Sequence, residues 1–219
     1  MNSRSQTFDL EVEGYQVDEA VASIFHSVLL HRSLGKFSYK SEGRYKVGTV
    51  GYEDVDCDFI DLTYVCCSSP QLERRLKNEI SVFSRALRRD DGPYCRGKIS
   101  LEFYQRKRAW WPFHSEMTPW EAWDLRIELV QLNTEAERAI FREKLGALLS
   151  EKIMRIAQVI NRNDYVPKVP DQSDLDLVFD TTYEDVQPYL FQISFVTATP
   201  PPPSVGSTVK KILRETLYM

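Results

Sequence analysis

Val17-Asp-Glu-Ala-Val-Ala-Ser-Ile-Phe-His-Ser-Val-Leu29 is the most informative stretch of the sequence, because its apolar residues recur at helical spacing. The residues at i, i+3 and i+4 positions are Val17, Ala20, Val21, Ile24, Phe25, Val28 and Leu29. His31 and Arg32 follow in the last turn and Gly35 stands just beyond, which is typical of a helix end. The pattern predicts an amphipathic helix that packs on a core.

Strand patterns flank this helix on both sides. Residues 8–12 alternate as a first strand, and residues 45–50 and 55–65 predict a hairpin with its turn at 51–54. In the second arm of this hairpin Cys57, Phe59 and Leu62 are expected to face inward, and Asp56, Asp58 and Asp61 outward. The alternation breaks near Ile60, which suggests a bulge.

Two further helices have clear start signals. Ser69-Pro70 provides a cap and a first-position proline, and Thr134-x-x-Glu137 is a capping box. The apolar stripe of the first is Leu72, Leu76, Ile80, Phe83 and Leu87, and that of the second is Phe141, Leu145, Leu148, Leu149, Ile153, Ile156 and Ile160. Both patterns predict helices with one buried face.

The remaining strands are expected at residues 98–104, 120–132 and 187–196, with a long loop at 105–119. Helices and strands do not alternate regularly, so we expect an α+β fold with a mainly antiparallel sheet backed by three helices. We expect one domain over residues 1–219. Within it, residues 200–219 form a proline-rich link and a short terminal amphipathic helix, whose apolar residues are Val209, Ile212, Leu213 and Leu217. This helix either docks on the core or binds a partner.

Composition narrows the classes of function. The chain has 28 basic and 32 acidic residues and a net charge of −4, which argues against nucleic acid as a partner. It contains neither an apolar run long enough to span a membrane nor the apolar core of a signal peptide. Its four cysteines lack the spacing of a zinc site. We therefore expect a cytoplasmic protein without a metal or cofactor.

Catalytic motifs are also missing from the sequence. Gly92-x4-Gly97-Lys98 resembles a phosphate-binding loop, but Ile99 stands where a Ser or Thr should bind magnesium. A helix is expected before this loop and a strand after it, which is the reverse of the required order. The three histidines are scattered. We expect no catalytic residues, and an enzyme that binds a nucleotide at Gly97-Lys98 is the remaining enzymatic alternative.

The expected loop at 105–119 carries the sharpest functional signal. Arg106, Lys107 and Arg108 precede a cluster of large rings, Trp110-Trp111-Pro112-Phe113. Such rings either fold back as a lid on the core or protrude as an anchor for a partner. Basic residues beside aromatic rings also suit a module that binds a membrane surface directly.

Several blocks of the sequence resemble the autophagy-related protein 101 family. They are Leu29-Leu-His-Arg-Ser33, Val47-Gly-Thr-Val-Gly51, Asp54-Val-Asp-Cys-Asp-Phe-Ile-Asp61, Ser100-Leu-Glu-Phe-Tyr-Gln105, Trp111-Pro-Phe113 and Asp185-Val-Gln-Pro-Tyr-Leu190. The resemblance covers nearly the whole chain. Trp110, the adjacent Cys66-Cys67 and the run of four prolines depart from the family pattern.

The resemblance implies a HORMA fold and a non-enzymatic adaptor of autophagy initiation. The implied main partner is the HORMA domain of autophagy-related protein 13, within the autophagy-initiating kinase complex. The finger at Trp111 and Phe113 would recruit downstream autophagy factors at the autophagosome assembly site. His31 and Asp54 are the implied heterodimer contacts, and the terminal helix would dock a lipid kinase complex.

Overall fold

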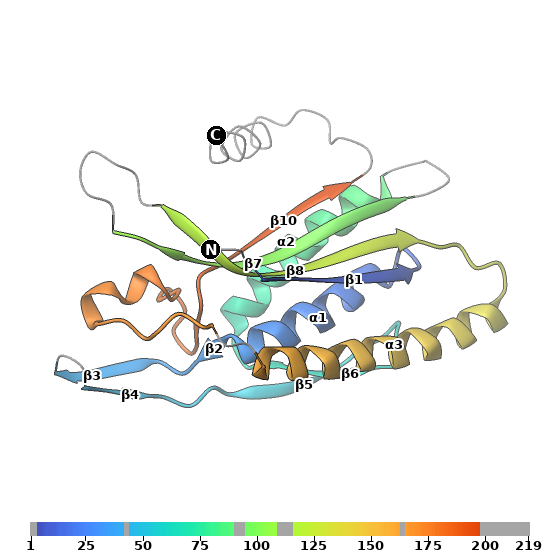
Figure 1. Ribbon diagram of the computed structural model, residues 1–219. Helices are drawn as coiled ribbons and strands as arrows, with labels where there is room; N and C mark the ends of the chain where they lie inside the picture. The colour runs from blue at the N-terminus through green and yellow to red at the C-terminus, as the bar shows by residue number, and fades with distance from the viewer. Residues whose placement is uncertain (1–3, 42–43, 90–94, 109–115, 163–164, 198–219) are drawn as a thin grey trace.

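The computed structural model describes residues 4–41, 44–89, 95–108, 116–162 and 165–197 (Figure 1). Three long helices and one short 3-10 helix accompany ten strands in this part of the chain. In chain order they are β1 Arg4–Val12, α1 Val17–His31, β2 Ser33–Leu34, β3 Phe37–Ser41, β4 Arg44–Val47, β5 Tyr52–Asp56, β6 Thr63–Cys67, α2 Pro70–Arg88, β7 Arg96–Arg106, β8 Met117–Leu129, α3 Glu135–Asn161, η1 Gln172–Leu177, β9 Gln187–Pro188 and β10 Phe191–Thr197.

The main sheet has the strand order β1-β8-β7-β10. The β7–β8 and β7–β10 pairs are antiparallel and only β1 lies parallel to β8, so the prediction of a mainly antiparallel sheet is confirmed. The register aligns Phe8, Leu125, Ile99 and Phe195 in one row across the four strands. This row belongs to the face of the sheet that packs on the helices.

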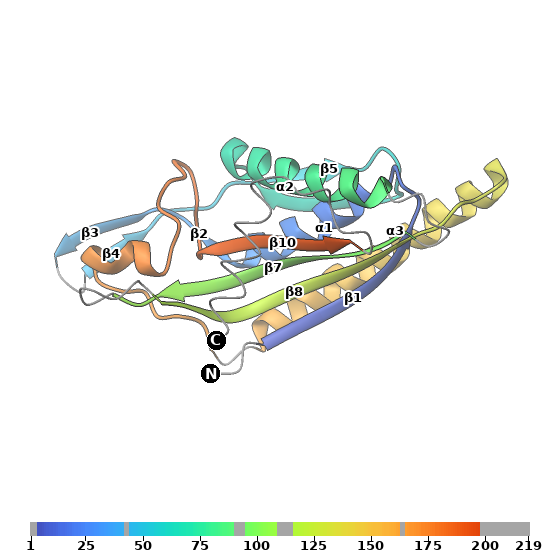
Figure 2. The ribbon, with the colours of Figure 1, turned by 90° about the horizontal axis from the view of Figure 1, so that it is seen from above.

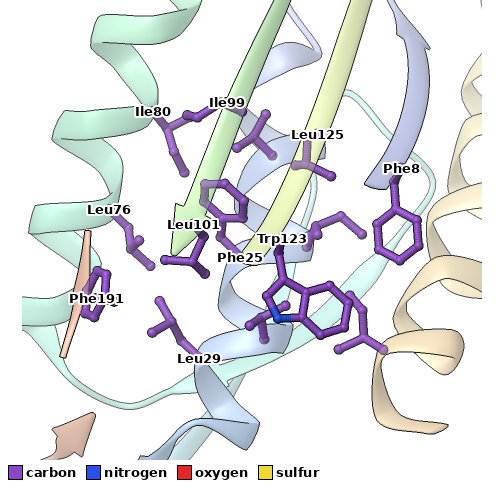
Figure 3. Packing of buried hydrophobic residues seen from close by; sticks show 14 of the residues in the cluster. Phe8, Phe25, Leu29, Leu76, Ile80, Ile99, Leu101, Trp123, Leu125 and Phe191 are labelled. Carbon is purple, nitrogen blue, oxygen red and sulfur yellow. The ribbon is translucent and has the colours of Figure 1, made fainter. Parts of the chain in front are cut away.

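Helix α1 lies beneath the sheet and contacts α2, α3 and β6 (Figures 1 and 2). All seven apolar residues of its predicted stripe are fully buried. Figure 3 shows Phe25 and Leu29 of this helix facing Leu101 and Trp123 of the sheet. The helix also buries Ser23 and Ser27, whose hydroxyls donate hydrogen bonds to the backbone oxygens of Ala20 and Ser23. Those bonds satisfy the buried hydroxyls. Because Ser23 and Ser27 lie outside the apolar stripe and are also buried, α1 is enclosed on several sides.

Helix α2 begins as the sequence predicts. The Ser69 hydroxyl accepts a hydrogen bond from the Leu72 N–H, Pro70 opens the first turn, and all five stripe residues are buried. The helix lies very close to the sheet at Gly97, where an added Cβ would stand 2.9 Å from a Phe83 ring carbon and 3.0 Å from a Leu87 methyl. Gly97 is thus required by helix packing on β7.

Helix α3 has the predicted capping box between Thr134 and Glu137. Its buried face is narrower than predicted, because Leu148 is 37% exposed while Leu145, Leu149 and Ile156 are buried. At Gly146 a Cβ would collide with the backbone oxygen of Asp61. The helix therefore packs directly on the turn between β5 and β6.

The predicted hairpin of residues 45–65 is wrong in register. The structure has two separate ribbons, β3–β4 and β5–β6, and the expected turn at 51–54 lies largely within β5. The actual reversal spans residues 57–62, where the Cys57 N–H donates to the Leu62 oxygen at 3.0 Å. Its aspartates are turn residues and not the outward residues of a strand. Ile60 is fully buried, and Phe59, which was expected to face inward, is 47% exposed.

Two other boundaries also differ from the prediction. The β7–β8 hairpin is longer than expected, since the strands reach Arg106 and Met117 and leave a connection of residues 107–116. The expected last strand at 187–196 is divided into β9 and β10, because the Tyr189 N–H bonds to the Arg32 oxygen.

The expected terminal helix lies outside the described residues, with its apolar residues Val209, Ile212, Leu213 and Leu217.

Candidate functional site

The finger predicted from the sequence, Trp110, Trp111, Pro112 and Phe113, lies outside the described residues. The end of the β7–β8 hairpin on either side of it, residues 104–107 and 116–120, is described, and we call it the stalk. Beyond Phe103 and Glu121 the β7–β8 hairpin has no flanking strand in the described sheet, since β10 pairs up to Phe103 and β1 up to Glu121. Figure 1 shows this hairpin extending past its neighbours. At its end the Lys107 N–H donates to the Glu116 oxygen at 3.0 Å. The stalk therefore projects from the sheet, and its two strands remain hydrogen-bonded to each other up to Lys107 and Glu116.

The three cations before the finger are engaged within the chain. The Lys107 ammonium lies 3.0 Å from a Glu116 carboxylate oxygen, and the Arg108 guanidinium pairs with Asp174 of η1. The Arg106 guanidinium carbon lies 5.9 Å from the centre of the Tyr104 ring. These contacts brace the stalk, and two of the three cations have an acidic partner beside them.

A buried ion pair anchors the root of the stalk. The Arg32 Nε and Nη2 donate to the two carboxylate oxygens of Glu121 at 2.9 and 2.6 Å. Glu121 also accepts a hydrogen bond from the Trp123 indole N–H at 2.8 Å, and the Arg32 guanidinium carbon lies 5.5 Å from the Trp120 ring centre. The Tyr189 N–H donates to the Arg32 oxygen at 3.0 Å. The end of α1, the stalk strand β8 and the segment before β10 thus share one cluster.

Sequence reasoning missed this cluster, although one signal could have revealed it. Glu121 lies two residues before Trp123, on the face of β8 that the alternation assigns to the core. A carboxylate on a buried face is costly unless it has a charged partner. The alternation could therefore have indicated a buried cationic partner for Glu121, although it could not identify Arg32 as that partner.

The two implied heterodimer residues are both exposed, on different elements. His31 is the last residue of α1, and partial burial together with the neighbouring Arg32 charge lowers the pKa of its imidazole. Asp54 lies on β5 directly opposite Val65 of β6. Both side chains are accessible to a partner.

Asp54 belongs to an outer face of the β5–β6 ribbon that exposes apolar surface. Tyr64 and Cys66 of β6 are buried, on the side where this strand contacts α1. On the opposite face Tyr52 is 74% exposed and Val65 is 37% exposed. We call Tyr52, Asp54 and Val65 the outer face of β5–β6. It combines a large ring, a branched apolar residue and a charge, and exposed aromatic rings of this kind are enriched in protein–protein interfaces.

The motif at Gly97-Lys98 lies in strand β7, where Gly97 allows α2 to approach. The Lys98 ammonium is 3.3 Å from a carboxylate oxygen of Asp124 on the neighbouring strand. Both residues are used by the sheet and its helix. Their position is not that of a phosphate-binding loop at a helix N-terminus.

The cysteines are reduced thiols. Burial raises the pKa of Cys57 and of Cys66 to about 12, and it also raises the pKa of Cys67. The adjacent Cys66 and Cys67 are both buried and form no disulfide. A thiol protonated at neutral pH is a poor nucleophile and metal ligand.

Across the described residues no cluster of three or more His, Cys, Asp or Glu could hold a metal ion. In the same part of the chain no helix is long and apolar enough to cross a membrane.

Together these features define an α+β protein with a helix-backed, mainly antiparallel sheet and several projecting ribbons. The family model described as Autophagy-related protein 101 matches residues 9–173. The chain is 51% identical over 219 residues to autophagy-related protein 101 from Homo sapiens and from Bos taurus, covering all of each chain. It is 25% identical over 187 residues to the Arabidopsis thaliana protein of that name, covering 76% of this chain and 80% of the relative. The chain belongs to the autophagy-related protein 101 family, and its role lies in autophagy.

Proposed function

We propose that the chain is a non-enzymatic adaptor of autophagy initiation, built as one HORMA domain over residues 1–219. It binds and stabilises the HORMA domain of autophagy-related protein 13 in the autophagy-initiating kinase complex. Through the finger of Trp110, Trp111, Pro112 and Phe113 it recruits downstream autophagy factors. It acts in the cytoplasm and at the autophagosome assembly site.

The observation that carries this proposal is the exposed outer face of β5–β6. A tyrosine ring buries roughly 150–250 Å² in an interface. At about 25 cal/mol per Å² Tyr52 therefore contributes up to about 6 kcal/mol. Association costs about 4–15 kcal/mol, so this face needs further contacts to form a stable complex. His31 at the end of α1 supplies one such contact in the proposed interface.

The same magnitudes assign a different task to the finger. Trp111 and Phe113 together bury on the order of 300–500 Å², which is worth at most about 7–12 kcal/mol. That is too little to offset the cost of association with a wide margin. The finger therefore suits a second binding event, made by a chain that is already held in a complex.

The β7–β8 stalk supports a protruding anchor over a lid on the core. It extends beyond its flanking strands and ends on the Lys107–Glu116 rung. The alternative of a membrane module at this loop is less well supported, because Lys107 and Arg108 already have acidic partners. We propose the terminal helix, with Val209, Ile212, Leu213 and Leu217, as a further docking element for a lipid kinase complex.

Variants of the outer face test the heterodimer. Tyr52→Ala combined with Asp54→Lys is expected to weaken binding to the HORMA domain of autophagy-related protein 13 by at least about tenfold. The loss follows from removal of the ring and reversal of a charge at the interface. Titration calorimetry gives the affinity, and thermal unfolding of the free variant checks its fold.

The matched control is Val82→Ala combined with Glu73→Lys on α2. Both residues are exposed, and the control has the same charge reversal together with truncation of an exposed apolar side chain that is smaller than Tyr52. The control is expected to bind as the unaltered chain does. Equal affinity of the outer-face variant and the unaltered chain would exclude this face as the interface.

A further inference from the structure

The β3–β4 ribbon projects from one end of the molecule, away from the main sheet (Figures 1 and 2). Its two strands pair only with each other in the described part of the chain. The register places Ser38 opposite Lys46 and Tyr39 opposite Tyr45. Alternation then separates an aromatic face from a polar face.

The aromatic face fixes the ribbon to the rest of the protein. Phe37 packs on Phe179 with a ring-centre distance of 5.2 Å, and Tyr39 and Tyr45 pack at 5.7 Å. The Tyr39 hydroxyl donates to the Pro170 oxygen at 3.0 Å. At the base, the Lys36 ammonium donates to the Thr181 oxygen at 3.3 Å. These contacts hold the ribbon in one orientation.

The opposite face carries Ser38, Lys40, Arg44 and Lys46, and we call these four residues the basic face. All four are exposed. The three cations form no ion pair with any described residue, whereas Lys98, Lys107 and Arg108 each pair with a carboxylate. A chain of net charge −4 thus gathers unpaired positive charge on one projecting ribbon.

We propose that the basic face binds the surface of an anionic phospholipid membrane. A protein partner would need apolar residues in the centre of its interface. The basic face offers none, because its members are one serine and three cations. A membrane containing anionic lipid presents diffuse negative charge and makes no such demand.

The proposed contact is electrostatic and does not use the aromatic face. Tyr45 and Val47 lie on that opposite face, paired with Tyr39 and Phe37. The ribbon therefore lies along the membrane surface with its cations towards the lipid headgroups and inserts no apolar segment into the membrane.

This contact is weak by itself. Each basic residue near an anionic surface strengthens binding by about fivefold, so three cations contribute on the order of 100-fold. Such a contribution matters when other subunits already hold the chain near a membrane, because the second attachment is then intramolecular. This membrane contact is separate from the adaptor function and does not depend on the identity of the protein partner.

Flotation of the full chain with lipid vesicles tests the proposal. The chain is expected to float with vesicles of phosphatidylcholine and phosphatidylserine and to remain unbound with phosphatidylcholine alone. Binding is expected to fall at high salt because the charges are screened. The variant Lys40→Gln, Arg44→Gln, Lys46→Gln is expected to lose on the order of 100-fold in partition onto the anionic vesicles.

Two controls keep the result specific to the ribbon. Arg74→Gln, Lys77→Gln, Arg85→Gln removes three exposed cations from α2 and is expected to float like the unaltered chain. Trp111→Ala with Phe113→Ala is expected to retain most of the binding. Flotation lost in the finger variant and kept in the ribbon variant would overturn the proposal, as would absence of any flotation. Salt-sensitive retention on polyglutamate without vesicle binding would overturn it in favour of an acidic protein.

Discussion

Arg32 and Glu121 form the ion pair with the largest consequence for stability among the described residues. Their side chains are 5% and 3% exposed. Replacement of Glu121 by Gln removes the charge and leaves the Arg32 guanidinium buried without its partner. We expect the free energy of unfolding to fall by about 3 kcal/mol or more, measured by urea denaturation.

Glu128→Gln is the matched control for this substitution. Glu128 lies on the same strand and pairs with Arg96 at 2.7 Å, but the two side chains are 34% and 62% exposed. An exposed pair contributes less than about 1 kcal/mol. A loss at Glu121 no larger than the loss at Glu128 would show that the buried cluster does not anchor the stalk.

His26 gives the protein a specific dependence on pH. It is buried on α1 and packs on Tyr64 with a ring-centre distance of 5.7 Å. Burial lowers the pKa of its imidazole from 6.5 to about 4. The unfolded chain therefore takes up a proton before the folded protein does, and this contribution to stability is lost as the pH falls from 6.5 towards 4.

The variant His26→Phe keeps a ring in this position and removes the titration. Between about pH 7 and pH 4.5 its free energy of unfolding is expected to fall by about 2 kcal/mol less than that of the unaltered chain. Urea denaturation at the two pH values gives the comparison. Parallel pH profiles for the two proteins would mean that His26 takes up its proton at the same pH in the folded and unfolded states, which would contradict the lowered pKa.

Among the elements, the β7–β8 hairpin combines core residues with the proposed finger. Its described strands bury Ile99, Leu101 and Phe103 in the core, whereas Trp111 and Phe113 belong to the sequence between Lys107 and Glu116, the last residues that bond across the described hairpin. Trp111→Ala with Phe113→Ala is therefore expected to leave the thermal unfolding midpoint and heterodimer formation unchanged. The number of downstream factors retained at autophagosome assembly sites in cells is expected to fall.

The control for the finger variant is Met117→Ala, which removes an exposed apolar residue from the stalk strand and keeps the rings. It is expected to recruit normally. A large drop in the unfolding midpoint of the finger double variant would show that the two rings are part of the core.

The sequence predicted the helices better than the short strands, for a physical reason. The stripes of α1 and α2 repeat over several turns, so a single misleading residue does not hide the period. The β5–β6 ribbon has five residues in each strand, and its turn is rich in aspartate and contains the buried Ile60. Local alternation cannot distinguish such a turn from a bulged strand.

The candidate site was likewise only partly predictable from the sequence. Family resemblance, and not a local sequence pattern, identifies His31 and Asp54, and the structure shows both residues exposed, His31 on α1 and Asp54 on β5. The partners of Arg108 and Glu121 could not be predicted, because each lies far along the chain, at Asp174 and Arg32. Contacts of this kind depend on the tertiary fold and leave no periodic signal.

Across the whole molecule, different described surfaces have different chemistry. The outer face of β5–β6 offers a ring and a carboxylate, the β7–β8 hairpin extends beyond its flanking strands, and the β3–β4 ribbon carries cations without a described ion-pair partner. Several separate surfaces on one core allow several partners to be held at once. This arrangement is what we expect of an adaptor.

Calorimetric titration of the chain with the HORMA domain of autophagy-related protein 13 is the most direct test of the proposed adaptor function. We expect saturable one-to-one binding of micromolar affinity or tighter, because a stable heterodimer must form before the weak finger and ribbon contacts can act. Absence of any binding heat at two temperatures, with both proteins shown to be folded, would contradict the adaptor function proposed for this chain.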